Sequence, residues 1–134
     1  QLSKNIYAIS IPTANEEVYG SYTSIEHYYP KPQLLKMTKE GRRLFLGEEF
    51  FESGMSKDKS HLTKAKNIQN KVKVNGVIDE KVYRLDTDPE CKHSIALPKD
   101  DFAQLIYDQD EYSSGFDFSE FTKIFDVIRE VINL

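Results

Sequence analysis

The chain contains 134 residues, of which 39% are hydrophobic and 30% are charged, and this predicts one soluble domain over residues 1–134. No apolar run approaches the roughly 20 residues that cross a bilayer, so the sequence excludes a membrane span. Cys91 is the single cysteine, which excludes an internal disulfide. Together with the lack of a signal-peptide pattern, it predicts a cytoplasmic protein.

The charge is divided unevenly along the chain. The formal net charge of -4 disfavours a general coat for nucleic acid. Residues 1–73 carry 12 Lys and Arg against 8 Asp and Glu, a net of +4, whereas residues 74–134 carry 6 against 14, a net of -8. We therefore expect any basic contact surface in the first half and any acidic face in the second.

The chain begins at Gln1 and soon reaches the near-continuous apolar run of residues 6–11. Such a run predicts a strand buried on both faces. Because this strand would start almost at the first residue, we expect the chain to be a fragment of a larger protein. Residues 13–22 are polar and contain Gly20, which predicts a loop.

Short elements are expected between residues 24 and 51. Residues 24–29 form a compact aromatic segment, and residues 32–37 fit a short helix with proline in its first turn. Residues 42–46 fit a short strand, and residues 48–51 one helical turn with acids at its positive end.

The segment after residue 59 mixes helix and strand patterns. Ser60 can cap a helix over residues 60–70, whose apolar residues are spaced by three. Residues 71–74 alternate as in a strand, and the following Asn75-Gly76 pair predicts a hairpin whose return strand begins at Val77. Residues 82–85 fit a further strand.

Two helices are expected near the end of the chain. Pro98 opens the first, with two aspartates in its first turn. Asp117 and Glu120 have the spacing of a capping box, and Phe116 and Phe121 have that of a hydrophobic staple, so a second helix starts there. This long amphipathic helix presents an apolar stripe spaced 3-4-3-4 to a core or a partner, and its candidate partner-binding residues are Phe118, Phe121, Phe125 and Ile128. The fold class expected is α+β, a small mixed sheet with about four helices.

Lysines are concentrated between residues 57 and 73, where Asp58 is the one acidic residue. Lysine ammonium groups act as mobile point charges toward phosphate. The segment is therefore a candidate contact for phosphate, nucleic acid or an acidic partner, although a solvated surface is the alternative. The candidate residues are Lys57, Lys59, Lys64, Lys66, Lys71 and Lys73.

Carboxylates at two places are candidate metal ligands. Asp86 and Asp88 alternate in the chain, a spacing that can present oxygen atoms to Mg²⁺ or Ca²⁺. Pro89 follows them and favours an ordinary turn as the alternative. Glu26 stands beside His27 in the aromatic segment, where it could orient the imidazole or serve a metal. A capping carboxylate or an exposed pair is the alternative.

The sequence Ser24-Ile25-Glu26-His27-Tyr28-Tyr29 resembles the "IENY"-type motif near the end of Toprim domains in overcoming-lysogenization-defect-like nucleases and related bacterial phage-defence proteins. Residues 42–45 and 97–103 are similar to parts of the C-terminal extension of such proteins. The resemblance implies a parent protein that is a Mg²⁺-dependent nuclease, with Glu26 near its metal site. The family's early catalytic glutamate is absent, and the Asp86-Thr87-Asp88 spacing follows the motif instead of preceding it.

These observations favour a non-catalytic C-terminal or accessory domain of a larger bacterial nucleic-acid-processing or defence protein. Such a domain would need no cofactor by itself, although the parent protein could use Mg²⁺. Its partners would be the rest of the parent polypeptide or another protein. The alternative function is a protein-interaction module that docks through the C-terminal helix or an acidic face. An independent small enzyme is least favoured, because no nucleophile or acid–base pair stands out.

Overall fold

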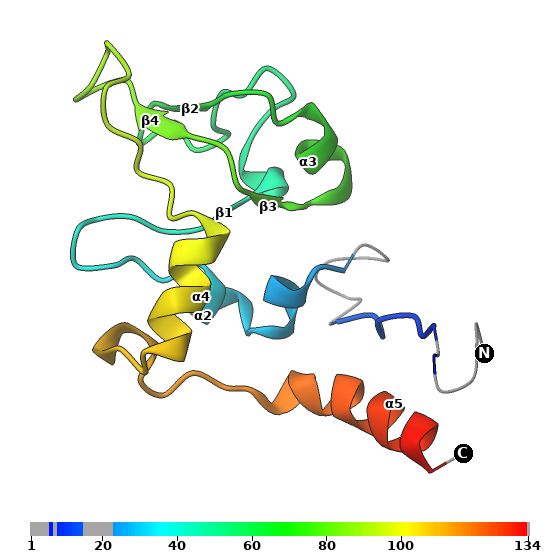
Figure 1. Ribbon diagram of the computed structural model, residues 1–134. Helices are drawn as coiled ribbons and strands as arrows, with labels where there is room; N and C mark the ends of the chain where they lie inside the picture. Colours follow the sequence, from blue (N-terminus) through cyan, green and yellow to red (C-terminus); the bar gives the residue numbers. More distant parts are fainter. Residues whose placement is uncertain (1–5, 7, 15–22, 134) are drawn as a thin grey trace.

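A computed structural model describes residue 6, residues 8–14 and residues 23–133 (Figure 1). Over these residues the fold is α+β, with four α-helices and two separate two-stranded antiparallel sheets. The predicted fold class and helix number are confirmed. The two sheets, β1–β3 and β2–β4, replace the single small sheet that was expected.

The elements of the described chain are short. In chain order they are η1 (Ile25–Tyr28), α2 (Lys31–Leu34), β1 (Phe45–Leu46), η2 (Gly47–Glu49), β2 (Thr63–Ala65), α3 (Gln69–Val74), β3 (Val77–Ile78), β4 (Val82–Arg84), α4 (Lys99–Tyr107), η3 (Glu111–Ser113), η4 (Ser119–Phe121) and α5 (Thr122–Ile132), where η denotes a 3₁₀-helix. In Figure 1 the strands and α3 form the upper part, and α2, α4 and α5 lie below them.

The β1–β3 sheet lies between two apolar cores. Phe45 pairs with Ile78 and Leu46 with Val77, and successive side chains along a strand point to opposite faces. The helical core contains Leu34, Leu44, Leu46, Val77, Leu97, Phe102, Tyr112 and Phe116. The sheet core contains Phe45, Phe50, Ala65, Ile68, Ile78, Val82 and Ala96. This alternation places Arg43, two residues before Phe45, on the side of the sheet core.

Residues 63–65 form strand β2, so the helix predicted over residues 60–70 is wrong. Thr63 and Ala65 are buried while Lys64 is exposed, which is the period of two that a strand requires. Leu62, which the helical spacing assigned to a buried face, is exposed. β2 pairs with β4, with Thr63 opposite Arg84.

Residues 69–74 form helix α3, so the predicted strand at 71–74 and the predicted hairpin are also wrong. Asn75 has the left-handed conformation, with φ of 50°. The backbone N–H groups of Asn75 and Gly76 both donate to the carbonyl of Lys71, the latter at 2.8 Å. The Asn-Gly pair therefore closes the C-terminus of a helix, where left-handed residues are as useful as in a hairpin turn.

The apolar run near the start of the chain does not form the predicted buried strand in its described part. Residues 8–13 have no regular secondary structure. Ile6, Ile9 and Ile11 are exposed. Most of the predicted loop over residues 13–22 lies outside the described residues.

The two helices expected near the end of the chain are both present. α4 follows Pro98, and η4 continues directly into α5 along the lower edge of Figure 1. Asp117 accepts the backbone N–H of Ser119 at 2.8 Å, whereas Glu120 pairs with Lys123 at 2.7 Å instead of completing a capping box. No helix of the described chain is long and apolar enough to cross a membrane.

Candidate ligand-binding cleft

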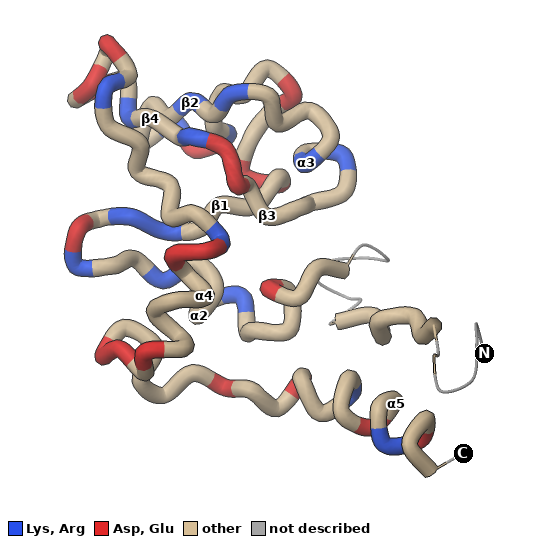
Figure 2. The backbone as a smooth tube through the Cα atoms, viewed as in Figure 1, with Lys and Arg blue, Asp and Glu red and all other residues tan. Residues whose placement is uncertain are grey.

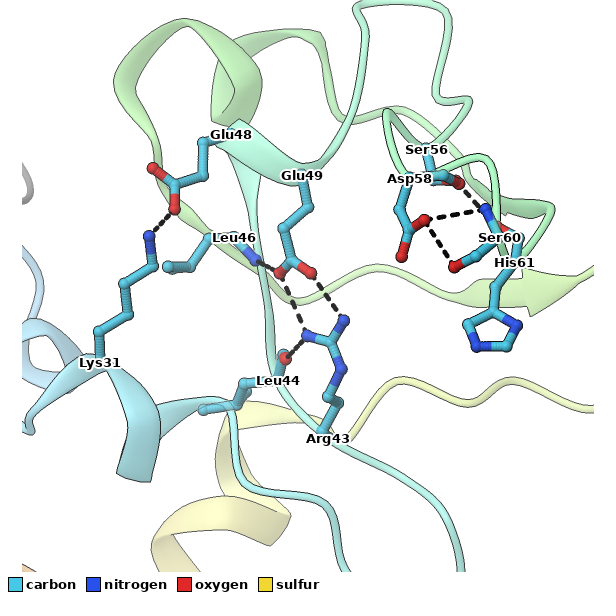
Figure 3. Close-up of polar contacts among 10 residues, drawn as sticks. All are labelled: Lys31, Arg43, Leu44, Leu46, Glu48, Glu49, Ser56, Asp58, Ser60 and His61. Atoms are coloured by element: carbon cyan, nitrogen blue, oxygen red, sulfur yellow. Dashed lines mark hydrogen bonds and ion pairs between the residues drawn. The ribbon is translucent and has the colours of Figure 1, made fainter.

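A cleft of about 540 Å³ opens on the sheet core beside β1, the loop of residues 56–61 and β4. Phe45, Phe50 and Ile95 supply its apolar lining. Its charged and polar lining comes from several segments of the chain, namely Arg43, Glu49, Lys57, Asp58, His61 and Arg84. Figure 3 shows the Arg43–Glu49 pair on one side and the loop that carries Asp58 and His61 on the other.

Arg43 is held by a fixed set of partners. Its guanidinium lies 3.8 Å from the centre of the Phe45 ring. Its Nη2 donates to Glu49 Oε2 at 2.6 Å, and its Nη1 donates to Glu49 Oε1 at 3.2 Å and to the Leu44 carbonyl at 2.9 Å. Glu49 Oε1 also accepts the backbone N–H of Leu46 at 2.8 Å. The carboxylate of Glu49 thus fixes both the start of η2 and the arginine.

The loop that carries His61 is closed by its own polar groups. Ser56 Oγ donates to the carbonyls of Asp58 and His61 at 2.8 and 3.1 Å. Asp58 Oδ1 accepts the backbone N–H and the hydroxyl of Ser60 at 2.9 and 2.7 Å (Figure 3). These two hydrogen bonds lower the pKa of Asp58. The carboxylate therefore serves the loop and stays charged.

The pairing of β2 with β4 brings His61 close to Arg84. Arg84 Nη2 lies 3.1 Å from His61 Nδ1 and donates to Asp86 Oδ2 at 2.6 Å. The hydrogen bonds between Arg84 and Asp86 raise the pKa of the arginine and lower the pKa of the aspartate. Arg84 is thus oriented by Asp86 and presents one edge of its guanidinium to the imidazole.

The structure separates the six candidate lysines. Lys57 lines the cleft, whereas Lys64 is on the face of β2 opposite to that of Thr63. Lys71 and Lys73 belong to α3, and Figure 2 shows these basic segments along different parts of the upper tube. Within the part of the chain that the structure describes, none of the six forms an ion pair (Lys57, Lys59, Lys64, Lys66, Lys71 and Lys73).

The three candidate metal ligands each have a protein partner. Glu26 is buried in η1 with Oε2 at 3.5 Å from Lys99 Nζ, and Asp86 holds Arg84. Asp88 accepts the backbone N–H groups of Lys92 and His93 at 3.1 and 2.8 Å. In the described ranges no three His, Cys, Asp or Glu side chains form a group that could hold a metal ion.

The four candidate partner-binding residues behave differently from one another. Phe121 is half-buried, with its ring 5.3 Å from that of Tyr28 and 5.0 Å from that of Tyr29. Phe118 also contacts Tyr29, at 5.7 Å, but remains exposed. Phe125 and Ile128 have exposed fractions of 59% and 40%. The first part of the predicted apolar stripe therefore packs against the domain, whereas Phe125 and Ile128, farther along it, are exposed.

Sequence reasoning missed the residues that give the cleft its character. Arg43, His61 and Arg84 are far apart in the chain and meet through the register of two sheets. The one local signal was the position of His61 inside the lysine-rich stretch. A long-range strand pairing was needed to join it to Arg84.

Comparison of the chain with protein-family models, with curated proteins and with solved structures gave no match.

Proposed function

We propose that the chain is a non-catalytic accessory or C-terminal domain of a larger bacterial nucleic-acid-processing or defence protein, and that it contacts nucleic acid. The observation that carries the proposal is that the six lysines of residues 57–73 have no ion-pair partner among the described residues. An ammonium group that is not held in an ion pair keeps its attraction for phosphate, and the released counterions favour binding.

The non-catalytic part of the proposal is supported by the partners of the carboxylates. Lys99 lies beside Glu26, Arg84 donates to Asp86, and two backbone N–H groups donate to the carboxylate of Asp88. Binding of a metal by any of them would require breaking these interactions. Under this proposal Mg²⁺ belongs to the parent protein, and the partners of the chain are nucleic acid and the rest of that polypeptide. The compartment is the cytoplasm, where the free thiol of Cys91 stays reduced.

The test is binding of a fluorescein-labelled single-stranded dodecamer, measured by anisotropy at several salt concentrations. One variant changes Lys57, Lys59, Lys64 and Lys66 to Gln, and a matched control changes Lys39, Lys81, Lys92 and Lys123 to Gln. Both variants lose the same net charge. We expect the first variant to bind at least tenfold more weakly than the unsubstituted chain, with a salt slope reduced by about 0.7 for each phosphate that it no longer neutralises. The control should bind nearly as tightly as the unsubstituted chain.

Two results would overturn the proposal. Equal reductions of affinity in the two variants, or no binding by the unsubstituted chain at moderate salt, would show that the basic stretch does not have the proposed role. Cleavage of the dodecamer with Mg²⁺, abolished by Glu26→Ala, would show that the chain is catalytic.

A second candidate function is a protein-interaction module, favoured by the exposure of Phe125 and Ile128 on α5. An amphipathic helix with an uncovered apolar stripe can enter a groove or pair with a copy of itself. Sedimentation velocity tests pairing directly, with F125D/I128D as the variant. A concentration-dependent dimer that the variant abolishes would support self-pairing, and a monomer at every concentration would exclude self-pairing.

A further inference from the structure

The lining of the cleft combines two kinds of side chain. Phe45, Phe50 and the guanidinium of Arg43 line it together with Lys57 and His61, and Figure 3 shows Arg43 and His61 on opposite sides. A volume of about 540 Å³ falls within the range of small-molecule sites. A ligand that fills it needs an apolar, flat part and an anionic part.

Arg43 is suited to stacking rather than to holding phosphate. Its Nη1 and Nη2 groups already donate to Glu49 and to the Leu44 carbonyl, so its charge is neutralised in place. The guanidinium covers the ring of Phe45 at 3.8 Å and still lines the cleft. Flat guanidinium groups held in this way are surfaces on which unpaired nucleobases stack.

Lys57 and His61 are the donors available to the anionic part. Lys57 has no ion-pair partner among the described residues. His61 Nδ1 lies 3.1 Å from Arg84 Nη2, and a ring nitrogen that accepts from Arg84 leaves Nε2 as a donor. Asp58, the acid nearest to them in the chain, is engaged by Ser60 (Figure 3).

We infer that the cleft holds one unstacked nucleotide of a single strand, with its base against Arg43 and Phe45 and its phosphate on Lys57 and His61. This inference rests on the proposed function and gives it a ligand. The exposed lysines outside the cleft would then follow the neighbouring phosphates of the same strand.

The first arm of the test uses the mononucleotide dAMP, followed by ¹H–¹⁵N NMR of the whole chain. We expect saturable shifts at the backbone amides of Arg43, Lys57 and His61, and at least tenfold weaker binding of adenosine or inorganic phosphate alone. Shifts confined to lysines outside the cleft would overturn the inference, and so would phosphate that binds as well as dAMP.

The second arm compares variants on the single-stranded dodecamer. His61→Ala removes an exposed side chain and should weaken binding of both dAMP and the dodecamer about tenfold, with Lys81→Ala as the unaffected control. The dodecamer should bind more tightly than dAMP, because it adds phosphate contacts. Equal affinities would assign the cleft to a free nucleotide and overturn the assignment to a strand.

The two proposals fail in distinguishable ways. If the lysine variant weakens binding of the dodecamer while His61→Ala and dAMP have no effect, the inference about the cleft falls and the proposed function stands. If dAMP shifts the cleft residues but the dodecamer does not bind, the proposed function falls.

Discussion

Two hydrogen bonds, of 2.6 and 3.2 Å, join Arg43, two residues before β1, to Glu49, the last residue of η2. Both side chains are about three-quarters buried, and removal of one partner leaves the other charge poorly solvated. We expect Glu49→Ala to lower the free energy of unfolding by about 2 kcal/mol, measured by urea denaturation.

Glu52→Ala is the matched control for that variant, because Glu52 is exposed and exposed substitutions of this kind change stability by less than about 0.5 kcal/mol. A Glu49→Ala variant as stable as Glu52→Ala would show that the pair contributes nothing to the fold.

Gly47 allows η2 to lie against the backbone of α3. A Cβ atom at this position would overlap the carbonyl oxygen of Lys71 and lie 2.9 Å from the Cα of Val72. Because backbone atoms cannot move aside as a side chain can, we expect Gly47→Ala to cost about 3 kcal/mol, measured as a shift of the urea midpoint.

Gly41→Ala separates this clash from backbone strain. Gly41 has φ of 77° and nothing within 4 Å of the added Cβ, so its cost should be the left-handed strain alone, about 1 kcal/mol. If Gly41→Ala proves the more harmful of the two, the close approach of η2 and α3 is not as described.

Local patterns predicted those elements that local interactions determine. α4 and α5 followed from a helix-starting proline and from the 3-4-3-4 spacing of apolar residues, and the α+β class followed from the mixture of periods. Asn75-Gly76 misled because the left-handed conformation serves a helix end as well as a hairpin. The sequence marked the left-handed position and left open which structure would use it.

The cleft depended on contacts that are distant in the chain. The spacing of Leu62, Ala65 and Ile68 suggested a helix, yet Thr63 pairs with Arg84 in a sheet. Tertiary context decides between helix and strand for such short apolar patterns. Lys57 was a candidate phosphate contact from charge alone, and its place in a cleft beside His61 required that pairing.

His27 should make the stability of the domain depend on pH. Its exposed fraction is 1%. Burial lowers the pKa of His27 from the ordinary 6.5, although a hydrogen bond with the backbone of Asn75 and the charge of Glu26 oppose the change. Ser24 donates its backbone N–H to Nδ1 at 2.9 Å, an arrangement that suits the neutral ring.

The sign of the effect follows from proton uptake. The unfolded chain binds a proton near pH 6.5 while the folded chain does not, so stability is lost as the pH falls below 6.5, by at most about 1.4 kcal/mol per pH unit. As the pH is lowered from 7.5 to 6.5 and 5.5, the urea midpoint should fall more steeply for the unsubstituted chain than for His27→Gln. Parallel curves for the two would exclude this role.

Tyr112 should make the domain less stable as the pH rises into the alkaline range, whereas His27 makes it less stable as the pH falls. Its hydroxyl donates to the Lys36 carbonyl at 2.8 Å, and its ring packs 5.5 Å from that of Phe116. Burial raises the pKa of Tyr112 to about 12. The unfolded chain therefore loses this proton near pH 10 while the folded chain keeps it, and the stability that the tyrosine contributes is lost as the pH rises above 10.

At pH 7, Tyr112→Phe should cost about 1 kcal/mol, the net worth of one hydrogen bond. Between pH 9.5 and 11 the urea midpoint of Tyr112→Phe should fall less than that of the unsubstituted chain. The absorbance difference between the two proteins at 295 nm, where tyrosinate absorbs, should have its midpoint near pH 12. A midpoint near 10 would show that the hydroxyl of Tyr112 is open to solvent and that η3 packs more loosely against the segment after α2 than the hydrogen bond to Lys36 implies.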